Sequence, residues 1–176
     1  MGGYCYLNNA ALAAHALLSM GRVAIIDIDY HHGNGTQDIF WDDPRVFFAS
    51  IHAHPAQDYP YYAGYREERG GENAYGTTLN LPLPHGTGPD PYLAALNTAC
   101  AEVSAFKPAS LIVSLGFDTF KDDPIASFKL EVDTFAAIGS RLASLNLPTL
   151  YIQEGGYCLP KLGEMAVAFF GSIIQA

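Results

Sequence analysis

The sequence predicts an α/β domain built on a parallel sheet, and three observations support that prediction. Four short runs are almost wholly apolar and rich in β-branched residues, which is typical of strands buried on both faces. Segments with helical spacing of apolar residues alternate with those runs along the chain. The 176 residues contain no evident repeat, low-complexity tract or linker, so we expect one domain spanning 1–176.

Each element follows from a local signal. Asn8 or Asn9 can cap a first helix, which runs to Gly21. A weaker strand over 77–83 belongs near an edge of the sheet, because Pro82 has no N–H for a ladder hydrogen bond. The buried strands are expected over 22–29, 45–52, 110–116 and 149–156. The helices are expected over 10–20, 91–106, 131–145 and 161–174.

Charge and cysteine content narrow the range of partners. A net charge of −9 disfavours nucleic acid, because phosphate is repelled by such a field. It favours a cationic partner such as a polyamine or a lysine-rich tail, although solubility alone would account for it equally well. No apolar run approaches the ~20 residues that span a bilayer, so we expect no membrane association. Three cysteines, an odd number, fit reduced thiols in a cytoplasmic protein.

A polar stretch over 53–76, the tyrosine-rich loop, has little periodicity. Loops of this length in compact domains usually have a function. Its aromatic side chains could line a slot for a slender substrate, or they could pack within the loop itself. They are Tyr59, Tyr61, Tyr62, Tyr65 and Tyr75.

Ionisable residues follow every expected buried strand. The carboxyl ends of parallel strands meet at one edge of a sheet, and ligands bind there; we call the residues at and after these ends the rim. The rim residues with acidic, imidazole or phenol groups are Asp27, Asp29, Tyr30, His31, His32, His52, His54, Asp118, Glu154 and Tyr157. The convergence of so many such groups at one edge of the sheet indicates a functional site more strongly than any single motif does.

A metal site is the chemistry that this rim favours. Alternation along the first strand puts Asp27, Asp29 and His31 on one side of the chain. Asp29, His31 and Asp118 would supply two oxygens and a nitrogen, a set that suits Zn²⁺ with one position open for water, and other divalent ions too. Asp29 could instead cap a turn while His31 packs in the core. We favour the metal, because burying two carboxylates together without a counter-charge is costly.

Seven segments form a recognisable set: GGYCYLNNAALAA, DIDYHHGNGTQDIFW, SIHAHP, YPYYAGY, LNLPLPHGTG, SLGFDTFKDDP and QEGGY. In order and spacing they resemble the histone deacetylase family. They are especially similar to the bacterial acetylpolyamine amidohydrolases and the class II-like deacetylases. The resemblance implies the three-layer arginase/deacetylase α/β fold. The family's parallel sheet has more strands than the four or five expected here, so we expect the fold to be incomplete at the N-terminus.

The resemblance implies roles for individual residues. Asp29, His31 and Asp118 match the family's zinc ligands. Tyr157 matches the tyrosine whose hydroxyl stabilises the oxyanion formed from the acetyl carbonyl. The residues that match the substrate channel are Gly3, Tyr4, Tyr59 and Gly156.

The resemblance also implies one zinc ion per chain and structural potassium. The first potassium site, built partly from backbone carbonyls, matches Asp27, Asp29, His31, Ser50 and Ile51. The second and weaker one matches Phe40, Asp43, Val46 and Thr77. His32 and Asn34 adjoin the metal loop. Many family members have an aspartate in place of Asn34, as the partner of a catalytic histidine, although class II-like members often have asparagine.

The family's tandem histidine pair, its general base and electrostatic catalyst, lies before GGYCYLNN and is absent from this chain. His31 and His32 cannot replace it, because they belong to the metal loop. Of the others, we expect His15 to pack in the core and His54 to be structural rather than a base, while His85 has no evident partner. The base would come from another segment, from a partner subunit or from an unexpected residue.

The sequence thus predicts a zinc-dependent amidohydrolase that removes acetyl or other acyl groups from lysine side chains or polyamines. One alternative is a catalytically incomplete fragment or assembly module that binds zinc and acyl-lysine. A second is an arginase- or agmatinase-like hydrolase with two manganese ions, whose additional ligands are not found in 116–124. We also expect a homodimer or a missing N-terminal segment, because missing strands would leave a sheet edge bare.

Overall fold

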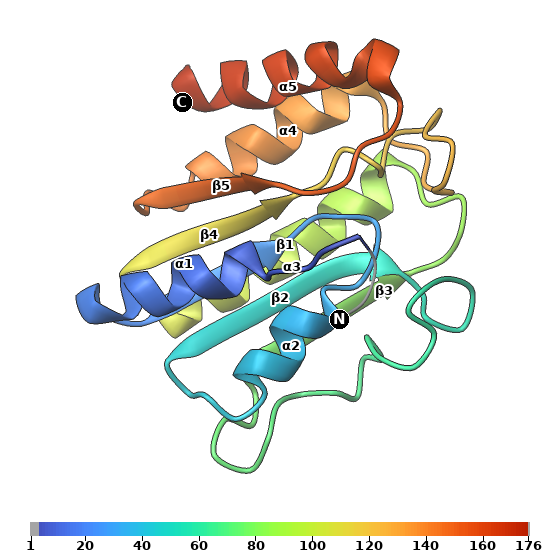
Figure 1. Ribbon diagram of the computed structural model, residues 1–176. Coiled ribbons are helices and arrows are strands. Elements are labelled where there is room, and N and C mark those ends of the chain that lie inside the picture. The colour runs from blue at the N-terminus through green and yellow to red at the C-terminus, as the bar shows by residue number, and fades with distance from the viewer. Residues whose placement is uncertain (1–3, 176) are drawn as a thin grey trace.

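The computed structural model describes residues 4–175, which form an all-parallel sheet with helices on both faces (Figure 1). The strand order is β3-β2-β1-β4-β5, and the strands are β1 (Val23–Asp27), β2 (Val46–Ala53), β3 (Thr78–Leu83), β4 (Ser110–Leu115) and β5 (Thr149–Gln153). The helices are α1 (Asn9–Leu17), α2 (Asn34–Phe40), α3 (Pro89–Phe106), α4 (Val132–Ala143) and α5 (Leu159–Ile174), with a short 3-10 turn η1 (Leu18–Met20). The predicted fold class is confirmed.

Alternate residues of β1 face opposite sides of the sheet and enter separate apolar cores. Ala24 and Ile26 pack in the core formed with α3, α4 and α5. Val23 and Ile25 pack in the core formed with α1 and α2. All four side chains are fully buried, so β1 is the centre of a three-layer structure.

Two differences from the predicted elements lie next to the rim. The first strand ends at Asp27, two residues early, because Asp27 Oδ1 accepts the N–H of Asp29 at 3.1 Å and the chain turns out of the sheet. Helix α2 was not predicted, since its glycine-containing sequence has low helix propensity. Burial of Gln37 and Phe40 on its inner face stabilises it.

The two edges of the sheet differ from each other. β3 is an edge strand, as predicted from Pro82. β5 is the other edge strand, and the prediction that it is buried on both faces was wrong: Leu150 is 44% exposed. An apolar pattern indicates a strand, but it does not say whether both sides of that strand have neighbours.

The first helix begins as predicted, with one correction. Asn8 is the cap, and its Oδ1 accepts the N–H of Ala11 at 2.7 Å. His15, predicted to be a packed core residue, is exposed instead, with its ring centroid 5.3 Å from that of Phe40.

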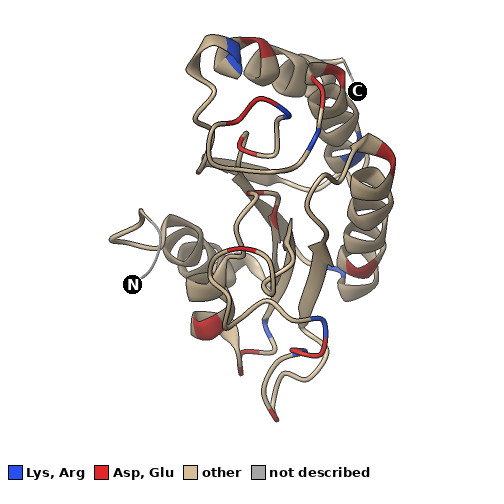
Figure 2. Cartoon of the chain, turned by 90° about the vertical axis from the view of Figure 1, so that its right-hand side faces the viewer, with Lys and Arg blue, Asp and Glu red and all other residues tan. Residues whose placement is uncertain are grey.

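Charged residues lie mostly on loops and helices in the view of Figure 2. None of the described helices is long and apolar enough to cross a membrane. The buried acidic residues in the described part of the chain are Asp27, Asp118 and Asp123, each less than a tenth exposed. All three follow or end β1 and β4, which directs attention to the rim.

Candidate metal centre

Three potential metal ligands converge where β1 and β4 end. Asp29 and His31 follow β1, and Asp118 follows β4, the strand that pairs with β1 in parallel. One ligand atom from each residue lies within 4.8 Å of the other two. His31 Nδ1 lies 3.3 Å from Asp118 Oδ2 and 3.5 Å from Asp29 Oδ1. The structure therefore brings together the three residues that the sequence predicts as zinc ligands.

Main-chain N–H groups hold the two carboxylates in place. Asp29 Oδ1 accepts the N–H of His31 and Asp29 Oδ2 that of Gly155, both at 2.8 Å. Asp118 Oδ1 accepts the N–H of Tyr30 at 2.9 Å. Asp118 Oδ2 is buried and has no hydrogen-bond donor within residues 4–175; it faces His31 Nδ1. A bound cation would satisfy such an oxygen.

The spacing suits a tetrahedral metal ion. Zinc bound at ~2.0–2.1 Å by nitrogen and oxygen places neighbouring ligand atoms roughly 3.4 Å apart. The distances of 3.3 and 3.5 Å from His31 Nδ1 to the two carboxylate oxygens agree with that geometry. One imidazole and two carboxylates also suit other divalent ions, and they leave a coordination position free.

The electrostatics of the cluster likewise favour a positive charge at its centre. Burial, and then the charge of Asp29, raises the pKa of Asp118 to about 7. Burial opposes a charge on His31, but the contacts of its ring with Asp118 and Asp29 outweigh that effect and raise the pKa of His31 to about 10. Protons therefore occupy the cluster when no metal does.

Two glycines leave room beside the carboxylates. A Cβ at Gly155 would meet Asp29 Oδ2 at 2.6 Å and would also meet Asp118 Oδ2. A Cβ at Gly116 would meet Asp29 Oδ2 at 2.6 Å and Asp118 Oδ1 at 2.7 Å. Sequence analysis did not assign them a role, although glycine directly after a strand is a signal of close backbone approach.

Tyr157, the predicted oxyanion-stabilising residue, lies beside this cluster. Its N–H donates to Asp123 Oδ2 at 2.8 Å, and its ring meets that of Tyr4 edge-on at 6.0 Å. Partial burial, followed by the charges of Asp29 and Asp118, raises the pKa of Tyr157 well above its ordinary value. The phenol therefore keeps its proton at neutral pH and can donate a hydrogen bond.

The other predicted channel residues have different surroundings. Gly156 has φ of +137°, and a Cβ there would lie 2.9 Å from Cβ of Phe117, so the turn before Tyr157 requires glycine. The Tyr59 ring lies 6.3 Å from that of His31. Gly3 lies outside the described residues.

Asp58 ties Tyr59 to the metal loop. Asp58 Oδ1 accepts the N–H of Tyr59 at 2.8 Å, and Oδ2 accepts the hydroxyl of Tyr30 at 2.7 Å. His85 Nε2 lies 3.2 Å from the same Oδ2, which gives His85 a partner that sequence analysis did not identify.

His32 points away from the metal cluster. Its Nε2 hydrogen-bonds to Gln37 Oε1 at 3.0 Å, and its ring lies 4.6 Å from that of His52. His52 in turn hydrogen-bonds to Ser50 at 2.8 Å and to the carbonyl of Gly64 at 2.9 Å. Burial lowers the pKa of His32 to about 4 and that of His52 to about 3, so both rings are neutral.

A polar network missed by sequence analysis extends from this histidine pair. Gln37 Nε2 donates to Glu68 Oε2 at 2.6 Å, and Asn80 Nδ2 donates to Gln37 Oε1 at 2.8 Å. Glu68 Oε2 also accepts the N–H of Gly64 at 2.9 Å. The network fastens the tyrosine-rich loop to α2 and β3.

Asn34 and His54 make contacts within the loop region. Asn34 Nδ2 donates to the hydroxyl of Tyr62 at 2.9 Å. His54 Nδ1 accepts the N–H of Ala56 at 3.1 Å, and its ring lies 6.0 Å from that of Tyr65. These contacts match the structural role predicted for His54.

The residues predicted for potassium lie in two places. In the first, Asp27 pairs with Ser50 in the ladder between β1 and β2, and Ile51 follows. Burial, and then the charge of Asp29, raises the pKa of Asp27 well above its ordinary value. In the second, the N–H of Asp43 donates to the carbonyl of Phe40, that of Val46 to the carbonyl of Asp43, and that of Phe48 to the carbonyl of Thr77.

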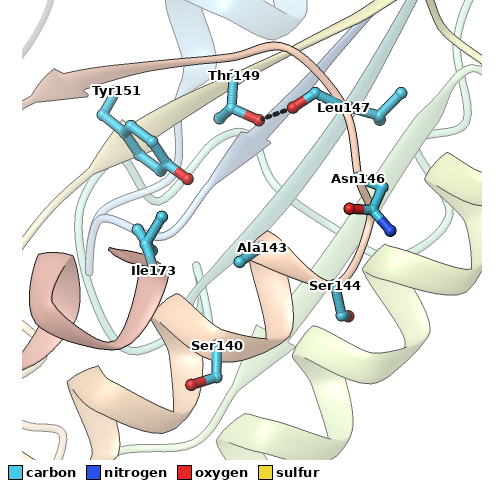
Figure 3. A pocket seen from close by; sticks show the side chains of 8 residues that line it. All are labelled: Ser140, Ala143, Ser144, Asn146, Leu147, Thr149, Tyr151 and Ile173. Carbon is cyan, nitrogen blue, oxygen red and sulfur yellow. Dashed lines mark hydrogen bonds between the residues drawn. The ribbon is translucent and has the colours of Figure 1, made fainter. Parts of the chain in front are cut away.

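A hollow of about 550 Å³ lies elsewhere, around the start of β5 (Figure 3). None of the predicted site residues lines it. Its lining residues are Ser140, Ala143, Ser144, Asn146, Leu147, Thr149, Tyr151 and Ile173. They lie in the last turn of α4, the loop after it, the first half of β5 and the end of α5, whereas the candidate ligands follow the carboxyl ends of β1 and β4, so the hollow is separate from the metal centre.

Known proteins resemble this chain over nearly its whole length. Acetylpolyamine amidohydrolase 1 of Pseudomonas aeruginosa is 52% identical over 169 residues, which are 95% of this chain and 49% of that protein. Acetylpolyamine amidohydrolase of Mycoplana ramosa is 46% identical over 92% of this chain and 48% of its own length. The crystal structure of acetylpolyamine aminohydrolase from Burkholderia pseudomallei superposes with a TM-score of 0.96 at 42% identity, covering 98% of this chain and 51% of that one.

The chain thus spans about half the length of the curated relatives that it matches. The family model of the histone deacetylase domain matches residues 1–173. Since that match covers nearly the entire sequence, the chain belongs to the histone deacetylase family.

Proposed function

We propose that the chain carries the metal-ligand part of a zinc-dependent amidohydrolase that removes acetyl groups from polyamines or lysine side chains. The observation that supports this most is the cluster of Asp29, His31 and Asp118, with ligand spacing suited to zinc and one buried carboxylate oxygen without a donor. The names of the two relatives given above, both acetylpolyamine amidohydrolases, favour an acetylated polyamine. The net charge of −9 suits a cationic substrate.

The protein's own groups have distinct parts in this proposal. Zinc, when bound, would polarise the acetyl carbonyl and lower the pKa of a water. Tyr157 keeps its phenol proton and donates it as a hydrogen bond to the oxygen on which negative charge develops. Tyr59, held by Asp58, borders the metal ligand His31 and would contact the acyl chain.

The general base is the open part of the mechanism. Among the described residues, the rings of His32 and His52 are buried in hydrogen bonds of their own, and His54 faces the tyrosine-rich loop. We therefore propose that the base comes from another segment or a partner subunit. A non-catalytic zinc- and acyl-lysine-binding module is the second candidate, favoured because no histidine of residues 4–175 other than the ligand His31 is directed at the cluster.

The proposal also covers the bound metal ions, the cellular location and the oligomeric state. We propose one zinc per chain and structural potassium at Asp27, Ser50 and Ile51, with a weaker potassium site at the Phe40–Val46 turn. A cytoplasmic location and a homodimer remain predictions. A two-manganese hydrolase is disfavoured, because residues 4–175 hold one cluster of three acidic or histidine ligands.

Hydrolysis of a fluorogenic acetyl-lysine substrate and of an acetylated polyamine by the zinc-loaded chain tests the proposal, with a chelated sample as control. Asp118→Ala should lose zinc binding, whereas Asp122→Ala, an exposed neighbour in the same turn, should retain one zinc per chain. Chelator-sensitive turnover supports the hydrolase. Zinc and hydroxamate binding without turnover supports the binding module, and full zinc stoichiometry in Asp118→Ala refutes the ligand assignment.

A further inference from the structure

A buried carboxylate outside the ligand cluster lies behind Tyr157. Asp123 is 7% exposed, and both of its oxygens accept main-chain N–H groups. Oδ2 accepts that of Tyr157 at 2.8 Å, and Oδ1 accepts that of Ile125 at 3.1 Å. Its neighbour Asp122 is exposed. Of two adjacent aspartates with the same charge, only one therefore contacts the Tyr157 segment through these bonds.

The hydrogen bond between Asp123 and Tyr157 lies just beyond the last main-chain hydrogen bond between the segments that follow β4 and β5. The N–H of Phe117 donates to the carbonyl of Gly155 at 2.9 Å, the last main-chain bond that ties this segment to the residues after β4. Gly156 follows with φ of +137°, a conformation that only glycine adopts freely. Beyond this glycine, the carboxylate of Asp123 hydrogen-bonds Tyr157 to the turn that follows β4.

The side chain of Tyr157 has little else to fix its direction. Within residues 4–175 its ring contacts that of Tyr4, which is 79% exposed. A hydrogen bond to an ionised carboxylate is roughly twice as strong as one between neutral groups, so Asp123 is a suitable anchor. The same turn carries Asp118, so the position of the phenol is linked to that of a metal ligand five residues earlier.

We propose that Asp123 is a positioning residue, which fixes the backbone of Tyr157 so that its phenol faces the Asp29, His31 and Asp118 cluster. This inference rests on the proposed function for its catalytic consequence, but not for its structural one. In this proposal Asp123 does not touch the ligand cluster or the substrate. It acts only by holding the backbone of Tyr157 in place.

The structural consequence is tested without activity. 3-Fluorotyrosine is placed at position 157, and its ¹⁹F NMR resonance is compared between the otherwise unchanged chain, Asp123→Ala, Asp123→Asn and the matched control Asp122→Asn. We expect a shifted or broadened resonance for Asp123→Ala, a smaller change for Asp123→Asn, whose amide oxygen still accepts the Tyr157 N–H, and none for Asp122→Asn. A resonance in Asp123→Ala identical to that of the unchanged chain overturns the inference. Should Asp123→Ala not fold, Asp123→Leu, which keeps a similar volume but accepts no hydrogen bond, is compared instead, and a resonance identical to that of the unchanged chain again overturns the inference.

The catalytic consequence is tested in the active, zinc-loaded protein. Asp123→Ala should lower kcat at least about tenfold with KM within about threefold, because a small displacement of a group acting on the transition state costs rate rather than binding. Combined with Tyr157→Phe, it should cause no further loss, because the hydroxyl it positions is gone. An equal loss in both backgrounds overturns the inference. Absence of turnover in the unchanged chain refutes the proposed hydrolase, while the NMR comparison still decides the role of Asp123.

Discussion

Replacing Asp118 with asparagine is expected to stabilise the metal-free chain while abolishing its tight metal binding. Asparagine keeps the Oδ1 that accepts the Tyr30 N–H, so the local geometry is preserved. It removes a negative charge that is fully buried and close to that of Asp29. In the metal-free chain, protonated His31, 3.3 Å away, compensates that charge only in part, because the pKa of Asp118 is still raised to about 7.

The magnitude follows from the raised pKa of Asp118, about 7 in the fold against 3.8 ordinarily. Because the folded chain holds this proton more tightly than the unfolded chain, the contribution of Asp118 to stability falls as pH rises from about 4 to about 7. A difference of roughly three pKa units at about 1.4 kcal/mol each gives an upper limit of about 4 kcal/mol above pH 7. Asparagine, which resembles the protonated acid, avoids this cost at every pH.

Urea unfolding in the presence of a chelator measures this effect at pH 8 and pH 5. Asp118→Asn should exceed the unchanged chain in unfolding free energy by up to about 4 kcal/mol at pH 8, and by less than half of that gain at pH 5. Asp122→Asn, an exposed change of the same charge, serves as the control. Excess zinc should reverse the order, because it stabilises only the chain that binds it. No gain at pH 8, or a gain independent of pH, would refute the reasoning.

Other substitutions probe the space around the site and the buried histidines. Gly155→Ala should weaken zinc binding at least about tenfold, because the methyl group would meet Asp29 Oδ2. Competition with a chromophoric chelator measures the affinity, and Gly163→Ala, whose methyl group would enter open space, is the control that should not change it. Equal affinities of the two variants would contradict this prediction. Gly64→Ala should lower the free energy of unfolding by about 1–3 kcal/mol and lower the melting temperature. The reason is that φ of Gly64 is +101° and the added carbon would lie 2.7 Å from His52 Nε2. An unchanged melting temperature would count against this prediction. The contribution of His52 to stability should fall as pH drops below about 6.5, because burial lowers the pKa of His52 to about 3 and the unfolded chain takes up the proton first. His52→Gln should reduce that loss in urea titrations at pH 7 and pH 5, and equal losses would speak against it.

The parts of the molecule that sequence analysis predicted are those set by periodicity and chain direction. Apolar runs located every strand of the sheet, and the shared direction of parallel strands placed Asp29, His31 and Asp118 at one rim. Their role as zinc ligands stays a prediction. The resemblance to histone deacetylases, carried by motifs over nearly the whole chain, was confirmed.

The parts that could not be predicted depend on contacts between distant segments. Helix α2 forms because its inner face is buried, which overrides weak local propensity. The bond from Asp123 to Tyr157 spans 34 residues, and that from Asp29 to Gly155 spans 126. Nothing in the local sequence distinguishes Asp123 from the exposed Asp122. The pairing of His85 with Asp58 likewise becomes evident only when two loops meet.

The pairing of β1 with β4 would limit the radius of a metal ion bound between Asp29 and Asp118. Asp29 and Asp118 reach toward each other from neighbouring strands, and ladder hydrogen bonds hold such strands about 4.8 Å apart. Asp29 is further restrained by its bond to the Gly155 N–H, after β5. A larger cation would have to spread these strand ends and stretch the main-chain bonds between them. Discrimination between metal ions by radius would thus reside in the backbone of three strands, and substitutions that alter their spacing would change metal preference without touching a ligand.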